Sequence, residues 1–180
     1  MKVLLIYPPE HPVFMKVIQA KIAPLGLMYI GAALEEAGFD VEILDANLLG
    51  LSYQEIAKEA ERRNPDLVGT SAFTTNIILD TIKVVEVVRS VLPDVPIVMG
   101  GAHPTFMPDD TFRRSPSLDV IVKGEGEATM VELAQVIDRL RRGGKDPRSR
   151  EAAEALSMVR GIAFRKHGDG EDKIVHTQYR

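Results

Sequence analysis

Short runs of branched apolar residues alternate along the chain with longer segments in which apolar residues recur every three or four positions. The short runs are typical of buried β-strands, and the longer periodicity is typical of amphipathic helices. Such an alternation predicts a parallel sheet with helices on both faces. The expected strands cover residues 2–7, 40–44, 66–71, 97–99 and 119–122.

The segments between these strands carry helix boundary signals. Gly38 ends the first periodic segment, and Pro65 closes the second. Ser52 is followed three residues later by Glu55, which is the spacing of a capping box. We therefore expect helices at about 25–37, 53–64, 75–91 and 127–141.

The chain changes character near Arg139. Residues 143–158 are charged and interrupted by glycine, which is typical of a solvated linker, and we expect this linker to turn helical near Ala152. Strand-like runs at 159–165 and 173–177 flank a glycine-containing turn and predict a β-hairpin. We expect an α/β domain over 1–142, a charged linker over 143–158 and a hairpin over 159–180. A lone hairpin is marginal in water, so this one must pack on the domain or on a partner.

Composition narrows the class of protein. A chain of 180 residues with 45% hydrophobic content can form one domain with its own core. The net charge of -4 comes without a basic tract, which argues against a nucleic acid partner. The chain has no cysteine, which excludes disulfides, thiolate metal sites and iron–sulfur clusters held by its own side chains. No apolar run is long enough to span a membrane, so we expect a cytoplasmic protein without a membrane partner.

Glycine-rich and hydroxyl-rich turns follow three neighbouring strands. In open α/β sheets ligands bind beyond the carboxyl ends of the strands, where glycine lets the backbone approach them closely. Hydroxyls at a helix amino terminus also favour a polar or anionic ligand. The candidate contacts are Ser71 and Thr74 after the third strand, Gly100, Gly101 and His103 after the fourth, and Gly124, Glu125 and Gly126 after the fifth.

Each of these residues also has a simpler interpretation. Thr74 can cap a helix, His103 can be a hydrogen-bonding loop residue, and Gly124 and Gly126 can supply a bend. We expect no catalytic residue and no metal ligand among them. If Gly101 gives room to a ligand, Gly101→Val should weaken ligand retention more than folding stability. Before the first helix, a loop running to Pro24 is unusually long and is expected to fold over the sheet edge.

Five short motifs, taken in their order along the chain, resemble the amino-terminal cobalamin-binding domain of cobalamin-dependent radical S-adenosylmethionine (radical SAM) proteins. The resemblance covers roughly residues 1–142. The motifs are Tyr7-Pro8-Pro9, Pro24-Leu25-Gly26-Leu27, Asp66-Leu67-Val68-Gly69, Gly100-Gly101-Ala102-His103-Pro104-Thr105 and Lys123-Gly124-Glu125-Gly126-Glu127.

This resemblance implies a flavodoxin-like (Rossmann-like) three-layer sandwich with a five-stranded parallel sheet in the order 2-1-3-4-5. It also implies that cobalamin lies at the carboxyl edge of the sheet, with its nucleotide tail near the third to fifth strands. The candidate contacts named above fall at the matching positions. Full-length members are methyltransferases or cyclases that act on small-molecule substrates.

Two departures from the family pattern limit what this chain can do. The Asp-x-His-x-x-Gly motif, which supplies a cobalt ligand in other cobalamin proteins, is absent, because Pro9 precedes Glu10-His11 and Phe14 stands at the glycine position. Without cysteine there is also no Cys-x3-Cys-x2-Cys cluster motif. We expect that S-adenosylmethionine and the four-iron, four-sulfur cluster belong to a radical SAM domain, in cis or in trans, and that this chain alone is not catalytic.

Other ligands are compatible with the same sheet edge. A nucleotide or sugar-nucleotide binding domain would use the same glycine turns, and a docking module would bind no cofactor. A response-regulator receiver is excluded, because Tyr7-Pro8 and Ser71-Ala72 occupy the places of its acidic residues.

Overall fold

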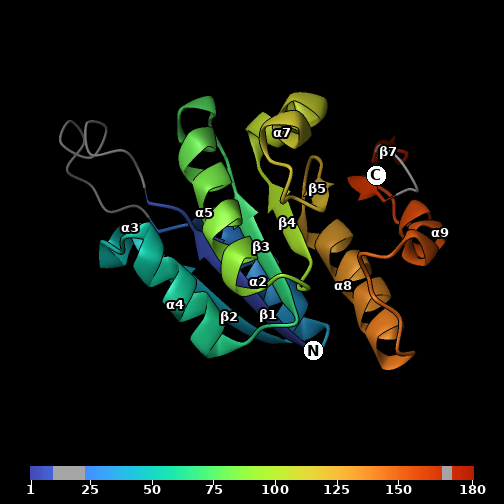
Figure 1. The fold of residues 1–180 in the computed structure, drawn as a ribbon, viewed down its shortest axis with the longest axis horizontal. Coiled ribbons are helices and arrows are strands. Elements are labelled where there is room, and N and C mark those ends of the chain that lie inside the picture. Colours follow the sequence, from blue (N-terminus) through green and yellow to red (C-terminus); the bar gives the residue numbers. More distant parts are fainter. Residues whose placement is uncertain (10–22, 168–171) are drawn as a thin grey trace.

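The computed structural model describes residues 1–9, 23–167 and 172–180, and these residues form one seven-stranded sheet in the order β2-β1-β3-β4-β5-β6-β7 (Figure 1). Strands β1 to β5 are parallel and pair in the predicted order 2-1-3-4-5, but the sheet holds seven strands and not the predicted five. The hairpin continues the sheet, because β6 pairs antiparallel with β5 and β7 with β6. The strands are β1 (Lys2–Tyr7), β2 (Asp40–Asp45), β3 (Leu67–Ser71), β4 (Ile97–Gly100), β5 (Val120–Val122), β6 (Ile162–Lys166) and β7 (Lys173–His176).

Four long helices form the outer layers of the predicted sandwich. Helices α2 (Leu25–Glu36) and α8 (Glu127–Arg142) pack on one face of the sheet. Helices α4 (Tyr53–Arg63) and α5 (Ile78–Val91) pack on the other, and the 3₁₀ turn η1 (Thr75–Ile77) leads into α5. The predicted capping box at Ser52 is present in full.

Short helices complete the fold; the helical turn expected near Ala152 is confirmed, whereas those before residue 143 were not predicted. They span at most two turns, which is too short for a helical period to show in the sequence. Two of them directly follow the carboxyl ends of β2 and β4 and therefore help to build the edge where a ligand is expected. The short helices are α3 (Ala46–Leu49), α6 (Ala102–Phe106), α7 (Pro108–Arg114), η2 (Arg150–Ala152) and α9 (Ala153–Ser157).

The segment expected to be a solvated linker packs against the domain. Arg148 Nε donates to Asp119 Oδ1 at 2.9 Å, and Ala153 and Leu156 are buried in the same core as α8. Asp119 also pairs with Arg89 of α5 and accepts from the backbone N–H of Ile97 at 2.7 Å. Charged residues near the linker therefore reflect a structural ion-pair network, which the sequence pattern did not reveal. The division of the chain at residue 142 stays a prediction.

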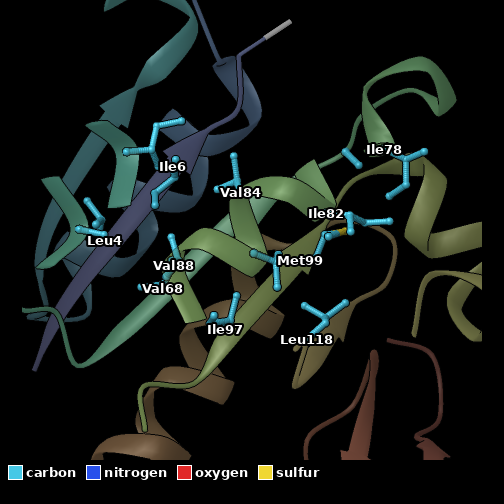
Figure 2. Close-up of a cluster of buried hydrophobic side chains, with 14 of the residues drawn as sticks. Leu4, Ile6, Val68, Ile78, Ile82, Val84, Val88, Ile97, Met99 and Leu118 are labelled. Carbon is cyan, nitrogen blue, oxygen red and sulfur yellow. The ribbon is translucent and has the colours of Figure 1, made fainter. Parts of the chain in front are cut away.

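Successive residues of each strand point alternately into two separate hydrophobic cores. Leu4 and Ile6 of β1 point into the core beneath α4 and α5, which Figure 2 shows, whereas Leu5 points to the core beneath α2 and α8. This alternation follows from the period of two along a β-strand. The long loop expected to fold over the edge lies outside the described residues. None of the described helices is both long enough and apolar enough to cross a membrane.

Candidate functional site

A cavity lies between the carboxyl half of the sheet and helices α2 and α8, with a volume of about 190 Å³. Leu5, Val98 and Val122 from three strands form part of its floor. Leu27 and Ile30 of α2, and Met130 of α8, form its walls. The interior is therefore mainly apolar and suits a flat, uncharged group more than an ion.

The cavity exists because small residues coincide on one face of the two middle strands. Gly69 and Ser71 of β3 share the parity of Leu67, and Gly100 of β4 shares that of Val98, so all three face α2 and α8. A Cβ at Gly69 would stand 2.8 Å from Leu5 Cδ2 and 3.7 Å from Met130 Cε. Gly69 was missed as a site residue. Its place inside a buried strand was the available signal, since glycine there often marks a close approach of a ligand or backbone.

Most of the predicted contact residues lie on this cavity. Residues Ser71, Gly100, Gly101, Gly124, Glu125 and Gly126 line it, whereas Thr74 and His103 are not among its lining residues. The structure thus brings together six residues from three separate turns. That they contact a ligand stays a prediction.

His103 and Thr74 have local partners instead. The Nδ1 atom of His103 lies 3.2 Å from Thr75 Oγ1, and its backbone N–H donates to the Ala72 carbonyl at 3.2 Å. Its Nε2 atom is buried and has no hydrogen-bond partner among the described residues. Thr74 precedes η1 without a side-chain cap bond and contacts the Asn76 side chain. His103 therefore joins the turns after β3 and β4.

Gly101 is required by the protein itself. Its φ of 102° lies in the region that favours glycine, and a Cβ there would stand 2.6 Å from the carbonyl carbon and oxygen of Ala72. The room that the glycine creates is filled by the neighbouring loop. The premise that Gly101 gives room to a ligand is therefore wrong. We now expect Gly101→Val to lower folding stability more than ligand retention.

Hydrogen bonds connect the turns around the cavity mouth. The Gly124 N–H donates to Thr105 Oγ1 at 3.0 Å, and Thr105 Oγ1 donates to the Gly101 carbonyl at 2.8 Å. Gly124 has a φ of 72°, and a Cβ there would meet nothing within 4 Å. The turn after β5 is thus fixed to the turn after β4, while its outer side stays open.

Lys123 fixes the other side of the same turn. Its side chain is buried, Nζ donates to the Thr177 carbonyl at 3.1 Å, and the ammonium lies 4.3 Å from the centre of the Tyr179 ring. Burial lowers the pKa of Lys123. No cluster of side chains able to hold a metal ion occurs in the described part of the chain.

Large apolar side chains are exposed on several segments of the same sheet edge. They belong to segments that follow the carboxyl ends of β1 to β4, and Phe106 is 80% exposed. Exposed apolar side chains are typical of interaction sites where they form a contiguous patch. The residues are Leu25, Met28, Tyr29, Leu48, Leu49, Phe73, Leu79, Phe106 and Met107.

Comparison with known proteins decides the family. Residues 12–134 match the B12 binding domain family. This chain belongs to that family. The B12 binding domain described here is similar to those of cobalamin-dependent radical SAM methyltransferases and cyclases, as the motifs implied.

Two curated relatives illustrate the similarity. An uncharacterized methyltransferase of Pyrococcus horikoshii is 35% identical over 168 residues, which are 93% of this chain and 33% of the relative. The anaerobic magnesium-protoporphyrin IX monomethyl ester cyclase of a Synechocystis species is 32% identical over 179 residues, 98% of this chain and 32% of the relative. The chain thus spans about a third of the length of these relatives.

Solved structures show the same fold. The radical S-adenosylmethionine methyltransferase TsrM from Kitasatospora setae superposes with a TM-score of 0.75 and 25% identity over 98% of this chain and 30% of that one. The cobalamin-dependent enzyme OxsB, with aqua-cobalamin and S-adenosylmethionine bound, gives a TM-score of 0.73 at 23% identity and covers 99% of this chain and 22% of that one.

Proposed function

We propose that this domain binds cobalamin at the carboxyl edge of its sheet, with the nucleotide end of the cofactor in the cavity and the corrin over the surrounding turns. The cavity with its glycine floor carries this proposal. Its volume of about 190 Å³ is below the roughly 300–1,000 Å³ of sites that enclose a whole drug-sized ligand. It therefore suits one end of a large ligand whose remainder lies outside.

The residues present fit such a cofactor. Gly69 leaves the floor open, and Leu27, Ile30 and Met130 offer apolar contact to a planar base. The turns at Gly100 and at Gly124–Gly126 present backbone without side-chain obstruction, since a Cβ at Gly100 would meet nothing closer than 3.8 Å. Thr74 and His103 would not contact the cofactor in the cavity but would hold the loops that border its mouth.

Bound cobalamin would supply a cobalt centre able to carry a methyl group or an electron to a neighbouring active site. This chain's own residues bind and orient the cofactor and keep water from its buried end. The Asp-x-His-x-x-Gly motif is absent, so we propose that no histidine of that motif holds the cobalt.

We further propose that a radical SAM domain, in the same polypeptide or in a second one, covers this edge and performs the reaction on a small-molecule substrate. Support comes from the exposed apolar side chains on this sheet edge, such as Phe73, Phe106 and Met107, and from the greater length of the relatives. S-adenosylmethionine and the iron–sulfur cluster would then belong to that domain, because this chain has no cysteine.

Adding hydroxocobalamin to the purified chain tests the cofactor directly. We expect a shift in the visible spectrum and a corrin that stays with the protein through desalting. Parallel thermal unfolding with ATP and with a uridine diphosphate sugar tests the rival ligands, because a bound ligand raises the melting temperature with its concentration. Loss of all corrin on desalting, together with stabilisation by a nucleotide, would contradict the proposal.

A further inference from the structure

A second hollow lies on the solvent side of the same two helices. The α2–α8 groove runs between the outer faces of α2 and α8, and its volume is about 690 Å³ against about 190 Å³ for the cavity. Its apolar part is built from Ala33, Ala37, Ala128 and Val131. Small side chains such as these let another helix approach closely, with its ridges in the groove.

Helix α2 has an unusual amount of uncovered apolar surface. Leu25 and Tyr29 are exposed on the same side of the helix as Ala33, at i, i+4 spacing, and Met28 is exposed further round the helix. A helix that is apolar on nearly all sides is normally buried on all sides. The outer face of α2 therefore has the composition of an interface.

The polar part of the groove is acidic. Glu36, Glu127 and Glu132 line it, and Glu36 has no basic partner among the described residues. Arg180 already occupies one end of the groove, where its Nε donates to Thr129 Oγ1 at 3.2 Å and its guanidinium pairs with Glu132. The groove thus accepts a basic side chain of this chain, and the carboxylate of Glu36 pairs with no cation of the described residues.

The charge also discriminates between occupants. A second copy packed symmetrically would bring the carboxylates of two grooves together, which is unfavourable. A basic segment would neutralise them.

We propose that the α2–α8 groove docks a helical segment of a partner polypeptide that carries arginine or lysine beside small or branched apolar residues. Glu127 lines both the groove and the cavity, so the docked segment would lie directly behind one wall of the cofactor site. The proposal does not depend on the identity of the cofactor.

The probe is a fluorescein-labelled synthetic peptide of about four helical turns with leucine on one face and arginine on its flanks, compared with a peptide in which glutamate replaces arginine. Fluorescence anisotropy with the purified chain should show binding of the arginine peptide alone. Glu36→Lys should weaken that binding about fivefold or more. Glu35→Lys is the matched control, because Glu35 precedes it, carries the same charge and is exposed outside the groove lining. It should change binding less than about twofold.

A second pair of variants tests the apolar floor. Ala33→Tyr would fill the groove, whereas Ala32→Tyr places the same ring on the neighbouring exposed position. Only Ala33→Tyr should abolish binding, and circular dichroism should report folded protein in both cases. Absence of binding up to about 1 mM protein, or equal losses within either pair, would overturn the proposal. Because these measurements use no cobalamin, their failure is distinguishable from failure of the cofactor titration.

Discussion

The two faces of the sheet use alternate residues of the same strands and yet have different interiors. Beneath α4 and α5, strand residues such as Leu4, Val68 and Met99 are buried together in one hydrophobic cluster, as Figure 2 shows. Beneath α2 and α8, Leu5 and Val98 are equally buried. Gly69 lies between these two residues, Gly100 lies beyond Val98 on β4, and neither glycine has a side chain that would fill the space. The cavity of the candidate site opens on this second face.

The difference teaches that one strand can serve packing and binding at once. Because successive side chains alternate between faces, β3 can place Val68 in a solid core and Gly69 on a cavity floor without changing its backbone. The filled face supplies the stability that lets the other face remain hollow, since unfilled volume in a core costs free energy.

The largest expected effect is on the filled face. Leu4→Ala removes a fully buried side chain and should lower the free energy of unfolding by about 3 kcal/mol, measured by urea denaturation. Corrin retention by the folded fraction should be nearly unchanged. A retention loss as large as the stability loss would show that the two faces are not independent.

Gly101→Val tests the contact between the turns after β3 and β4. The strained φ and the clash with the Ala72 backbone should lower the free energy of unfolding by about 2 kcal/mol. Denaturation of the chain without cofactor measures this effect. Gly124→Ala is the control, because a Cβ there meets nothing although φ is also positive. If the two variants unfold alike, backbone strain alone accounts for the loss.

Filling the cavity should separate binding from folding. Gly69→Val directs methyl groups toward Leu5 and Met130 and should weaken corrin retention about tenfold, equivalent to about 1.4 kcal/mol. The free energy of unfolding should change by no more than about 1 kcal/mol, because valine favours strands and the end of the Leu5 side chain, which the new Cβ would meet at 2.8 Å, can shift into the cavity that it lines. Equilibrium dialysis with hydroxocobalamin measures the first quantity. Gly31→Ala serves as a comparison, since Gly31 is buried outside the cavity lining.

The smallest effect concerns a polar contact on the filled face. Tyr53 Oη donates to Asp80 Oδ1 at 2.7 Å, and burial together with this carboxylate raises the pKa of Tyr53. Tyr53→Phe should lower the free energy of unfolding by about 1 kcal/mol at pH 8. A raised folded pKa means that this contribution is complete below pH ~10 and is lost above it, as the unfolded tyrosine ionises. Denaturation of both proteins at pH 8 and above pH 10 should show the difference shrinking; a constant difference would contradict the assignment.

Local signals in the sequence were sufficient for the regular elements. The periodicity placed all five parallel strands and the four long helices, and Ser52 with Glu55 specified a cap that forms from residues three apart. Short helices such as α6 and α7 were not predicted, because one or two turns show no helical period in the sequence. The hydrogen bond from Arg148 to Asp119 was not predicted, because the two residues lie 29 positions apart in the sequence.

The sequence by itself determined the order of the elements and the edge at which glycine turns gather, because both follow from neighbouring residues and from the direction of parallel strands. Tertiary structure decided which glycines leave space and which are filled. Gly69 faces a cavity that Leu27, Ile30 and Met130 of the covering helices also line, whereas the room at Gly101 is taken by the Ala72 loop. Tertiary structure also turned His103 toward Thr75. Such outcomes depend on residues that meet only when distant segments pack, so no local pattern encodes them.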